Sequence, residues 1–144
     1  MGRVERRNPN GYLVRVSEDA LVPLVLAGLE AWCVDHAHGN GRPRSGLETY
    51  ATLWGHQVRL GEDGRTVYCV EHVGVDTSAE RERRSVRPSE AALALKRELL
   101  SSLWPQSEFL GDIHTHPYGH VSEVATVQRG FSDQDVADIV DRSA

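Results

Sequence analysis

The feature that most constrains this chain is a histidine motif placed directly after an apolar run. The run Phe109–Ile113 is predicted to be a strand, and His114, Thr115, His116 and Pro117 follow it. Because side chains alternate along a strand, the two histidines share one face and the threonine takes the other. Proline cannot donate to a sheet ladder and ends the strand there. The motif therefore predicts two imidazoles at the end of a strand, where both can bind one metal ion.

A carboxylate that could complete this ligand set lies further along the chain. Ser132–Ile139 is predicted to start a helix, and Asp135 falls in its first turn, where the helix dipole favours a negative charge. Two histidines and one carboxylate are the ligands of a catalytic zinc that keeps one position open for water. A simpler reading is that Ser132 and Asp135 only form a helix capping box. The joint pattern, with Glu48 upstream as a candidate base, favours the metal site.

A second cluster of metal-binding residue types occurs earlier, at Cys33, His36 and His38. These residues span a helix end and a glycine-rich loop, with no fourth ligand nearby, and short matches of this kind arise easily by chance. A metal is therefore not expected there. Cys33 and Cys69 are the only two cysteines of the chain, and both are expected to be buried, reduced thiols.

The remaining pattern predicts strands that alternate with helices, which is typical of a mixed α/β domain. We expect one domain over residues 1–144. The predicted elements are a strand at Tyr12–Val16, a helix at Ala20–Cys33 capped by Ser17, a hairpin of Leu47–Leu60 and Thr66–Val75, a charged solvated loop at Ser78–Arg87, a helix from Glu90 to about Leu103 and a loop at Tyr118–Phe131.

Charge and hydropathy exclude two classes of partner. The chain has 16 Lys and Arg against 21 Asp and Glu, a net charge of −5, which argues against nucleic acid because a polyphosphate needs a basic surface. No apolar run approaches the roughly 20 residues of a membrane span. The first residues are charged without an apolar core behind them, which is unlike a signal peptide, so we expect a cytoplasmic protein.

Taken together, these motifs resemble the JAB/MPN (JAMM) metalloprotease family. The signature of that family is a glutamate on an early strand, then His-Ser/Thr-His-Pro, then Ser-x-x-Asp. Here Glu48–Gly55 resembles the glutamate strand, which typically ends in Leu-x-Gly, and His114–Pro117 and Ser132–Asp135 match the other parts. The order of elements fits from about Tyr12 to Ala144. The resemblance implies a JAB/MPN-type, cytidine-deaminase-like mixed sheet flanked by helices.

The resemblance also implies a function and a role for each motif residue. His114, His116 and Asp135 would bind Zn²⁺, Glu48 would be the general acid and base, and Ser132 would stabilise the oxyanion. The activity implied is that of a zinc isopeptidase or peptidase, which removes a ubiquitin-like protein from its conjugates or matures its C-terminus. The arginines of Ser78–Arg87 could contact such a substrate, although a solvated loop is the default for a charge run.

The chain departs from the family pattern in two places. Eighteen residues, 117–134, separate the second histidine from Asp135, which is an insertion, and only nine residues follow Asp135. A protein partner could therefore complete the sheet. Two alternative functions stay open: a non-catalytic MPN scaffold or binding module, and a small-peptide hydrolase in sulfur-carrier metabolism.

Overall fold

The structure, a computed structural model, describes residues 12–37, 41–60 and 65–119. That part of the chain is a small α/β domain with a mixed sheet and two helices. The elements are β1 (Tyr12–Val16), α1 (Glu18–Cys33), β2 (Tyr50–Leu60), β3 (Arg65–Val75), β4 (Glu80–Arg81), β5 (Val86–Arg87), α2 (Glu90–Leu103) and β6 (Glu108–His114).

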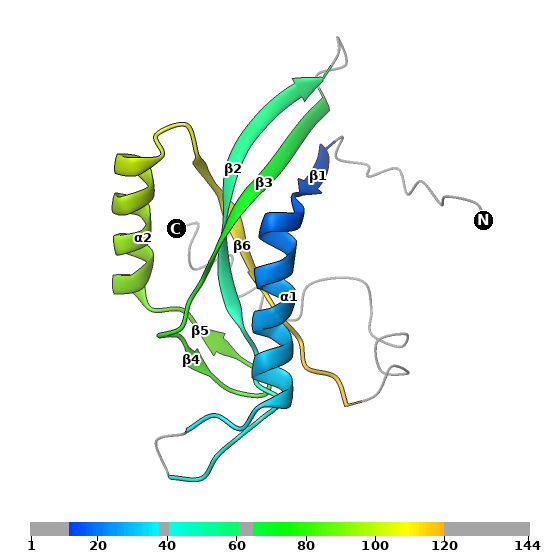
Figure 1. The fold of residues 1–144 in the computed structure, drawn as a ribbon, viewed down its shortest axis with the longest axis vertical. Coiled ribbons are helices and arrows are strands. Elements are labelled where there is room, and N and C mark those ends of the chain that lie inside the picture. Colours follow the sequence, from blue (N-terminus) through cyan, green and yellow to red (C-terminus); the bar gives the residue numbers. More distant parts are fainter. Residues whose placement is uncertain (1–11, 38–40, 61–64, 120–144) are drawn as a thin grey trace, which may run out of the picture.

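The main sheet has the strand order β1-β3-β2-β6 and is mixed. Strand β1 runs parallel to β3, whereas β2 is antiparallel to both β3 and β6. The two helices lie on opposite faces of this sheet (Figure 1). On one face, the Thr49 hydroxyl donates to the carbonyl of Ala27 in α1 at 3.5 Å. On the other, the Thr52 hydroxyl and the Lys96 stem of α2 both approach Gly74.

A serine caps each helix: Ser17 caps α1, as predicted, and Ser89 caps α2. The Ser17 hydroxyl accepts from the backbone N–H of Ala20 at 3.2 Å, and the Ser89 hydroxyl accepts from Ala92 at 3.3 Å. Each bond satisfies one of the orphan N–H groups of a first helical turn. The predicted helices, the first strand, the hairpin pairing and the strand before the histidines are all confirmed, with ends that differ by a few residues.

Strand β2 and the residues just before it form the centre of the core. All residues from 47 to 52 are buried, and Trp54 is buried against the ring of Phe109 on β6. At Gly55 the pairing with β3 shifts register. A Cβ atom there would lie 1.9 Å from the carbonyl oxygen of Cys69, so only glycine fits.

Three predictions need correction. The strand predicted from Leu47 begins at Tyr50. The backbone of residues 47–49 forms hydrogen bonds with α1 and with the β4–β5 segment and does not form a continuous ladder with a neighbouring strand. The charged segment predicted to be a solvated loop contains an antiparallel two-stranded ribbon, β4 with β5. Cys33 is exposed and Cys69 is half-buried, so the prediction of two buried thiols is wrong.

Two predicted segments fall outside the described residues. They are the helix at Ser132–Ile139 and, except for Tyr118 and Gly119, the loop at Tyr118–Phe131. Among the helices that are described, none is long and apolar enough to cross a membrane.

Candidate metal centre

The two histidines of the motif lie side by side at the end of β6. His114 is the last residue of that strand and pairs with Tyr50 of β2. The ring centroids of His114 and His116 are 4.7 Å apart, and the ring planes are inclined by 57°. The His116 side chain is 39% exposed, so solvent reaches this corner of the sheet. The strand alternation thus brings both imidazoles to one place, as the sequence predicts.

Thr115, between them, anchors the motif on the opposite face. Its backbone N–H donates to the carbonyl of Thr49 at 3.0 Å, and its hydroxyl accepts from the N–H of Thr49 at 2.9 Å. Its methyl group lies 3.3 Å from the Cβ position of Gly28 in α1. These two hydrogen bonds to Thr49 extend the β2–β6 pairing past the end of the regular strand and hold the backbone between the two histidines.

Glu48 is the third motif residue that the structure describes here. It is 4% exposed, and its Oε1 lies 3.7 Å from Nδ1 of His116. Its backbone N–H donates to the carbonyl of Glu82 at 2.9 Å, while the preceding Leu47 donates to Ala31 of α1 at 3.1 Å. Backbone hydrogen bonds therefore anchor the chain at Leu47 and Glu48. The buried carboxyl group of Glu48 lies next to the half-exposed imidazole of His116.

The fold thus brings together three of the five predicted site residues, and the other two, Ser132 and Asp135, lie outside the described part of the chain. Two adjacent imidazoles at a strand end fit a zinc ion in donor type. Across residues 12–37, 41–60 and 65–119, no group of three His, Cys, Asp or Glu side chains could hold a metal ion. A complete site therefore depends on a ligand from elsewhere, which is the role predicted for Asp135.

Two neighbours of the histidines were not predicted as site residues. The Tyr50 hydroxyl donates to the Asp112 carboxylate at 2.8 Å, and the Tyr118 ring stacks on His116 with a centroid distance of 6.2 Å. Asp112 shares the face of His114 because it lies two residues before it. That alternation is the sequence signal that could have included Asp112, whereas nothing in the sequence indicates the stacking of Tyr118.

An apolar groove of about 310 Å³ opens beside His116. It lies between α1 and the segment that follows β6. Helix α1 supplies half of the lining residues, including Leu29 and Trp32, which are 53% and 38% exposed. The groove is lined by Leu24, Val25, Gly28, Leu29, Trp32, Leu47, Ile113, Thr115, His116 and Pro117.

The second cluster gains no support as a metal site. The His36 ring nitrogen Nε2 is 3.1 Å from the carbonyl of Glu30, and the His36 backbone pairs with Arg44. Cys33 is exposed at the end of α1, and His38 lies outside the described residues. His36 therefore helps to close the turn after α1.

Comparison with known proteins assigns no family. The chain matches no protein-family model, and no curated protein matches it. The resemblance to JAB/MPN metalloproteases therefore depends on the motif residues and on how the fold arranges Glu48, His114 and His116.

Proposed function

We propose that this chain is a zinc-dependent metallopeptidase of the JAB/MPN type, which cleaves a ubiquitin-like protein from its conjugates or matures its C-terminus. One observation carries the proposal. The buried carboxyl group of Glu48 lies 3.7 Å from His116, whose ring is next to that of His114. These residues are far apart in the sequence, and each is the one that the motif requires.

The metal ligands in this proposal are His114, His116 and Asp135. Bound zinc supplies a Lewis acid that polarises the scissile carbonyl and lowers the pKa of water. The chain contributes two imidazoles at the end of β6, and the hydrogen bonds of Thr115 hold the backbone between them.

Glu48 moves the proton. It accepts a proton from the attacking water and donates it to the leaving amine, a lysine side chain or an α-amine. Its burial keeps bulk water away from the carboxylate, and the backbone bond to Glu82 fixes its position. General acid–base catalysis of this kind contributes typically about 10²–10⁴ in rate. Ser132 donates a hydrogen bond to the oxyanion, which is a further stabilisation of the transition state.

Two features beside the histidines suit an extended peptide. Strand β6 has one neighbour in the described sheet, β2, so its other edge can pair with a substrate strand. The apolar groove next to His116 can take an apolar side chain of the same substrate. Together they support a polypeptide substrate that lies along the metal strand.

Zinc content of the purified full chain tests the metal part of the proposal. We expect about one zinc per chain in the parent, none in His114→Ala and about one in His72→Ala. His72 is the matched control, since it is an exposed histidine on β3, away from the site. A parent chain without zinc would contradict the proposal and favour a scaffold role.

Cleavage assays on the zinc-loaded chain test the substrate class. We expect cleavage of an isopeptide-linked conjugate of a ubiquitin-like protein. Cleavage of a free dipeptide with none of the conjugate would favour the small-peptide hydrolase instead.

A further inference from the structure

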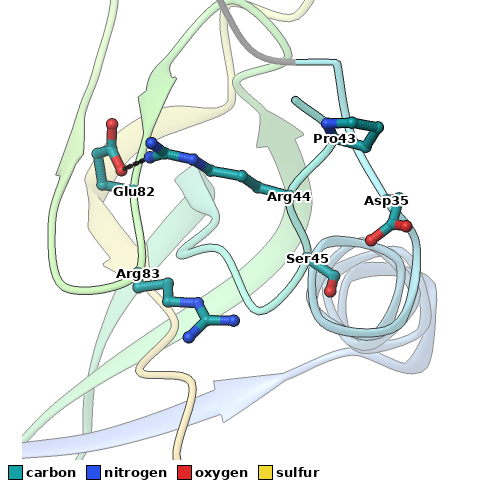
Figure 2. A pocket seen from close by; sticks show the side chains of 6 residues that line it. All are labelled: Asp35, Pro43, Arg44, Ser45, Glu82 and Arg83. Atoms are coloured by element: carbon teal, nitrogen blue, oxygen red, sulfur yellow. Dashed lines mark hydrogen bonds and ion pairs between the residues drawn. The ribbon is translucent and has the colours of Figure 1, made fainter. Parts of the chain in front are cut away.

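Strand β6, the last strand of the described sheet, carries exposed carboxylates. It contains Glu108 and Asp112, which are both exposed, and neither a lysine nor an arginine. The pocket between the β4–β5 ribbon and the loop after α1 differs, because its lining has two acidic and two basic side chains, and Glu82 pairs there with Arg44 at 2.7 Å (Figure 2). Opposite charges therefore balance in that pocket, whereas the outer edge of β6 is acidic.

A buried tyrosine holds the carboxylate of Asp112 near the candidate metal ligands. Tyr50 is 3% exposed and pairs with His114 in the β2–β6 ladder, and its hydroxyl donates to Oδ2 of Asp112 at 2.8 Å. Asp112 precedes His114 by two residues, so the two side chains share one face and lie about 7 Å apart along the strand. A charge that only prevents edge-to-edge pairing of sheets needs no such partner. The hydrogen bond therefore indicates that this carboxylate is held in a defined position.

A bulge in β6 comes directly before Asp112. The pairing of β2 with β6 shifts register between Leu53 and Trp54, which leaves one extra residue on β6 just before Gly111. Gly111 has a φ of +146°, a conformation that residues with a side chain rarely adopt. Bulges of this kind are frequent next to active sites, where they re-aim a side chain. Here the bulge sets the direction in which the Asp112 side chain leaves the strand.

We propose that Asp112 binds a basic side chain of a polypeptide substrate that pairs with the outer edge of β6. This inference rests on the proposed function, because it concerns the same substrate strand. A carboxylate has about four lone-pair sites, so it can accept from a lysine or arginine as well as from the Tyr50 hydroxyl. The apolar groove lies on the face of α1, together with Thr115, and thus on the face opposite to Asp112. Since the side chains of an extended substrate alternate between the faces, we expect a basic residue next to an apolar one.

Binding of labelled peptides to the full chain tests this charge preference without any catalytic step. The probe is the capped peptide Ser-Val-Arg-Val-Arg-Val-Ser with an uncharged fluorescent label, and the two comparison peptides have Gln or Glu in place of Arg. Fluorescence anisotropy at low salt gives the affinity for each peptide. We expect the parent chain to bind the Arg peptide most tightly and the Glu peptide least tightly, and added salt to reduce the difference.

Three variants separate Asp112 from the general negative charge of the chain. In Asp112→Asn the affinity for the Arg peptide should fall about fivefold, and the affinity for the Gln peptide should stay the same. Glu30→Gln is the matched control, since it removes an equal charge from an exposed position of α1, on the opposite face of the sheet, and should keep the parental affinities. Asp112→Arg should bind the Glu peptide more tightly than the Arg peptide, a gain that a loss of folding cannot produce.

Four results would overturn the inference. They are equal affinity of the parent for the Arg and Gln peptides, parental affinity for the Arg peptide in Asp112→Asn, an equal loss in Glu30→Gln, and no preference for the Glu peptide in Asp112→Arg. A charge preference that depends on Asp112, together with no cleavage of any conjugate, would contradict the proposed function alone.

Discussion

Two buried carboxyl groups lie at the same end of the sheet but in opposite surroundings. Asp76, at the end of β3, is 1% exposed, and its backbone N–H donates to the carbonyl of Tyr50. Its carboxylate accepts from the N–H and hydroxyl of Ser78 at 3.0 and 2.7 Å and from the N–H of Ser89 at 2.9 Å. These hydrogen bonds close the turn before α2, so the Asp76 carboxylate stabilises the connection between β3 and α2.

Glu48, two residues before Tyr50, is equally buried but faces a different neighbour. Its carboxylate lies 3.7 Å from the imidazole of His116, which is 39% exposed to solvent. His116 is open to solvent and to a ligand, whereas the donors around Asp76 are two backbone N–H groups and one hydroxyl that close a turn. Burial alone therefore does not distinguish a structural carboxylate from a candidate catalytic one, whereas the chemistry of the neighbouring groups does.

The largest expected effect comes from Glu48→Gln. The amide keeps the size of the side chain but cannot accept a proton, so the cleavage rate should fall by about 10²–10⁴. Zinc content and the free energy of unfolding should stay close to those of the parent. The comparison requires single-turnover cleavage, zinc analysis and urea unfolding of both proteins. Parental cleavage by Glu48→Gln would break the assignment of the two carboxyl groups.

Asp76→Ala should give the opposite result. Removing the carboxylate takes away the acceptor of the part-buried N–H groups of Ser78 and Ser89, so the free energy of unfolding should fall by about 2 kcal/mol. Zinc content measured below the melting temperature should be unchanged. Glu80→Ala is the matched control because Glu80 is exposed, and its effect should stay within about 0.5 kcal/mol. An equal loss in the free energy of unfolding in both variants would contradict a structural role for Asp76.

The sequence predicted the position of the two histidines better than the carboxylate network. Strand alternation and a terminating proline are local rules, so they placed His114 and His116 together and located the ends of β6 closely. The serine caps at Ser17 and Ser89 located both helices for the same reason. Glu48 was found through the motif, and its approach to His116 follows from the antiparallel pairing of β2 with β6.

The predictions that were wrong, or never made, depend on contacts between distant segments. The β4–β5 ribbon forms although each strand has only two residues, because the backbones of Glu82 and Glu48 bond to each other. Asp76 was not identified because its partners come from a turn and a helix cap. The exposure of Cys33 depends on what packs at the end of α1, which hydropathy does not indicate.

A pH series sharpens the role of Asp76. Burial by itself raises the pKa of Asp76, but the hydrogen bonds of Ser78 and Ser89 and the charge of Lys96 hold it below the ordinary value of 3.8. The folded state therefore binds fewer protons than the unfolded chain near that pH, and the stabilisation present above pH 3.8 is lost as the pH falls through the lowered pKa. The Asp76→Asn variant has no carboxyl group at this position, so its stability lacks this pH dependence.

Urea unfolding of the parent and of Asp76→Asn at about pH 7, 4 and 3 measures the effect. The difference in the free energy of unfolding should be constant from about pH 7 to 5 and should shrink below about pH 4. A difference that persists undiminished to the lowest pH would show that the carboxylate acts by shape and not by charge.

The smallest effect tests how firmly the segment of the two histidines is held. Three hydrogen bonds hold the Asp76 carboxylate, whereas the segment between the two histidines is held by one backbone bond and one side-chain bond between Thr115 and Thr49. Thr115→Val keeps the methyl group near Gly28 but removes the acceptor, so the free energy of unfolding should fall by about 1 kcal/mol. Thr115→Ser keeps the acceptor and is the matched control.

If the bond also positions the imidazoles, zinc affinity measured by competition with a chelator should fall in the valine variant and not in the serine variant. Equal zinc affinity in both variants would mean that the backbone pairing of β2 with β6 is sufficient to orient His114 and His116.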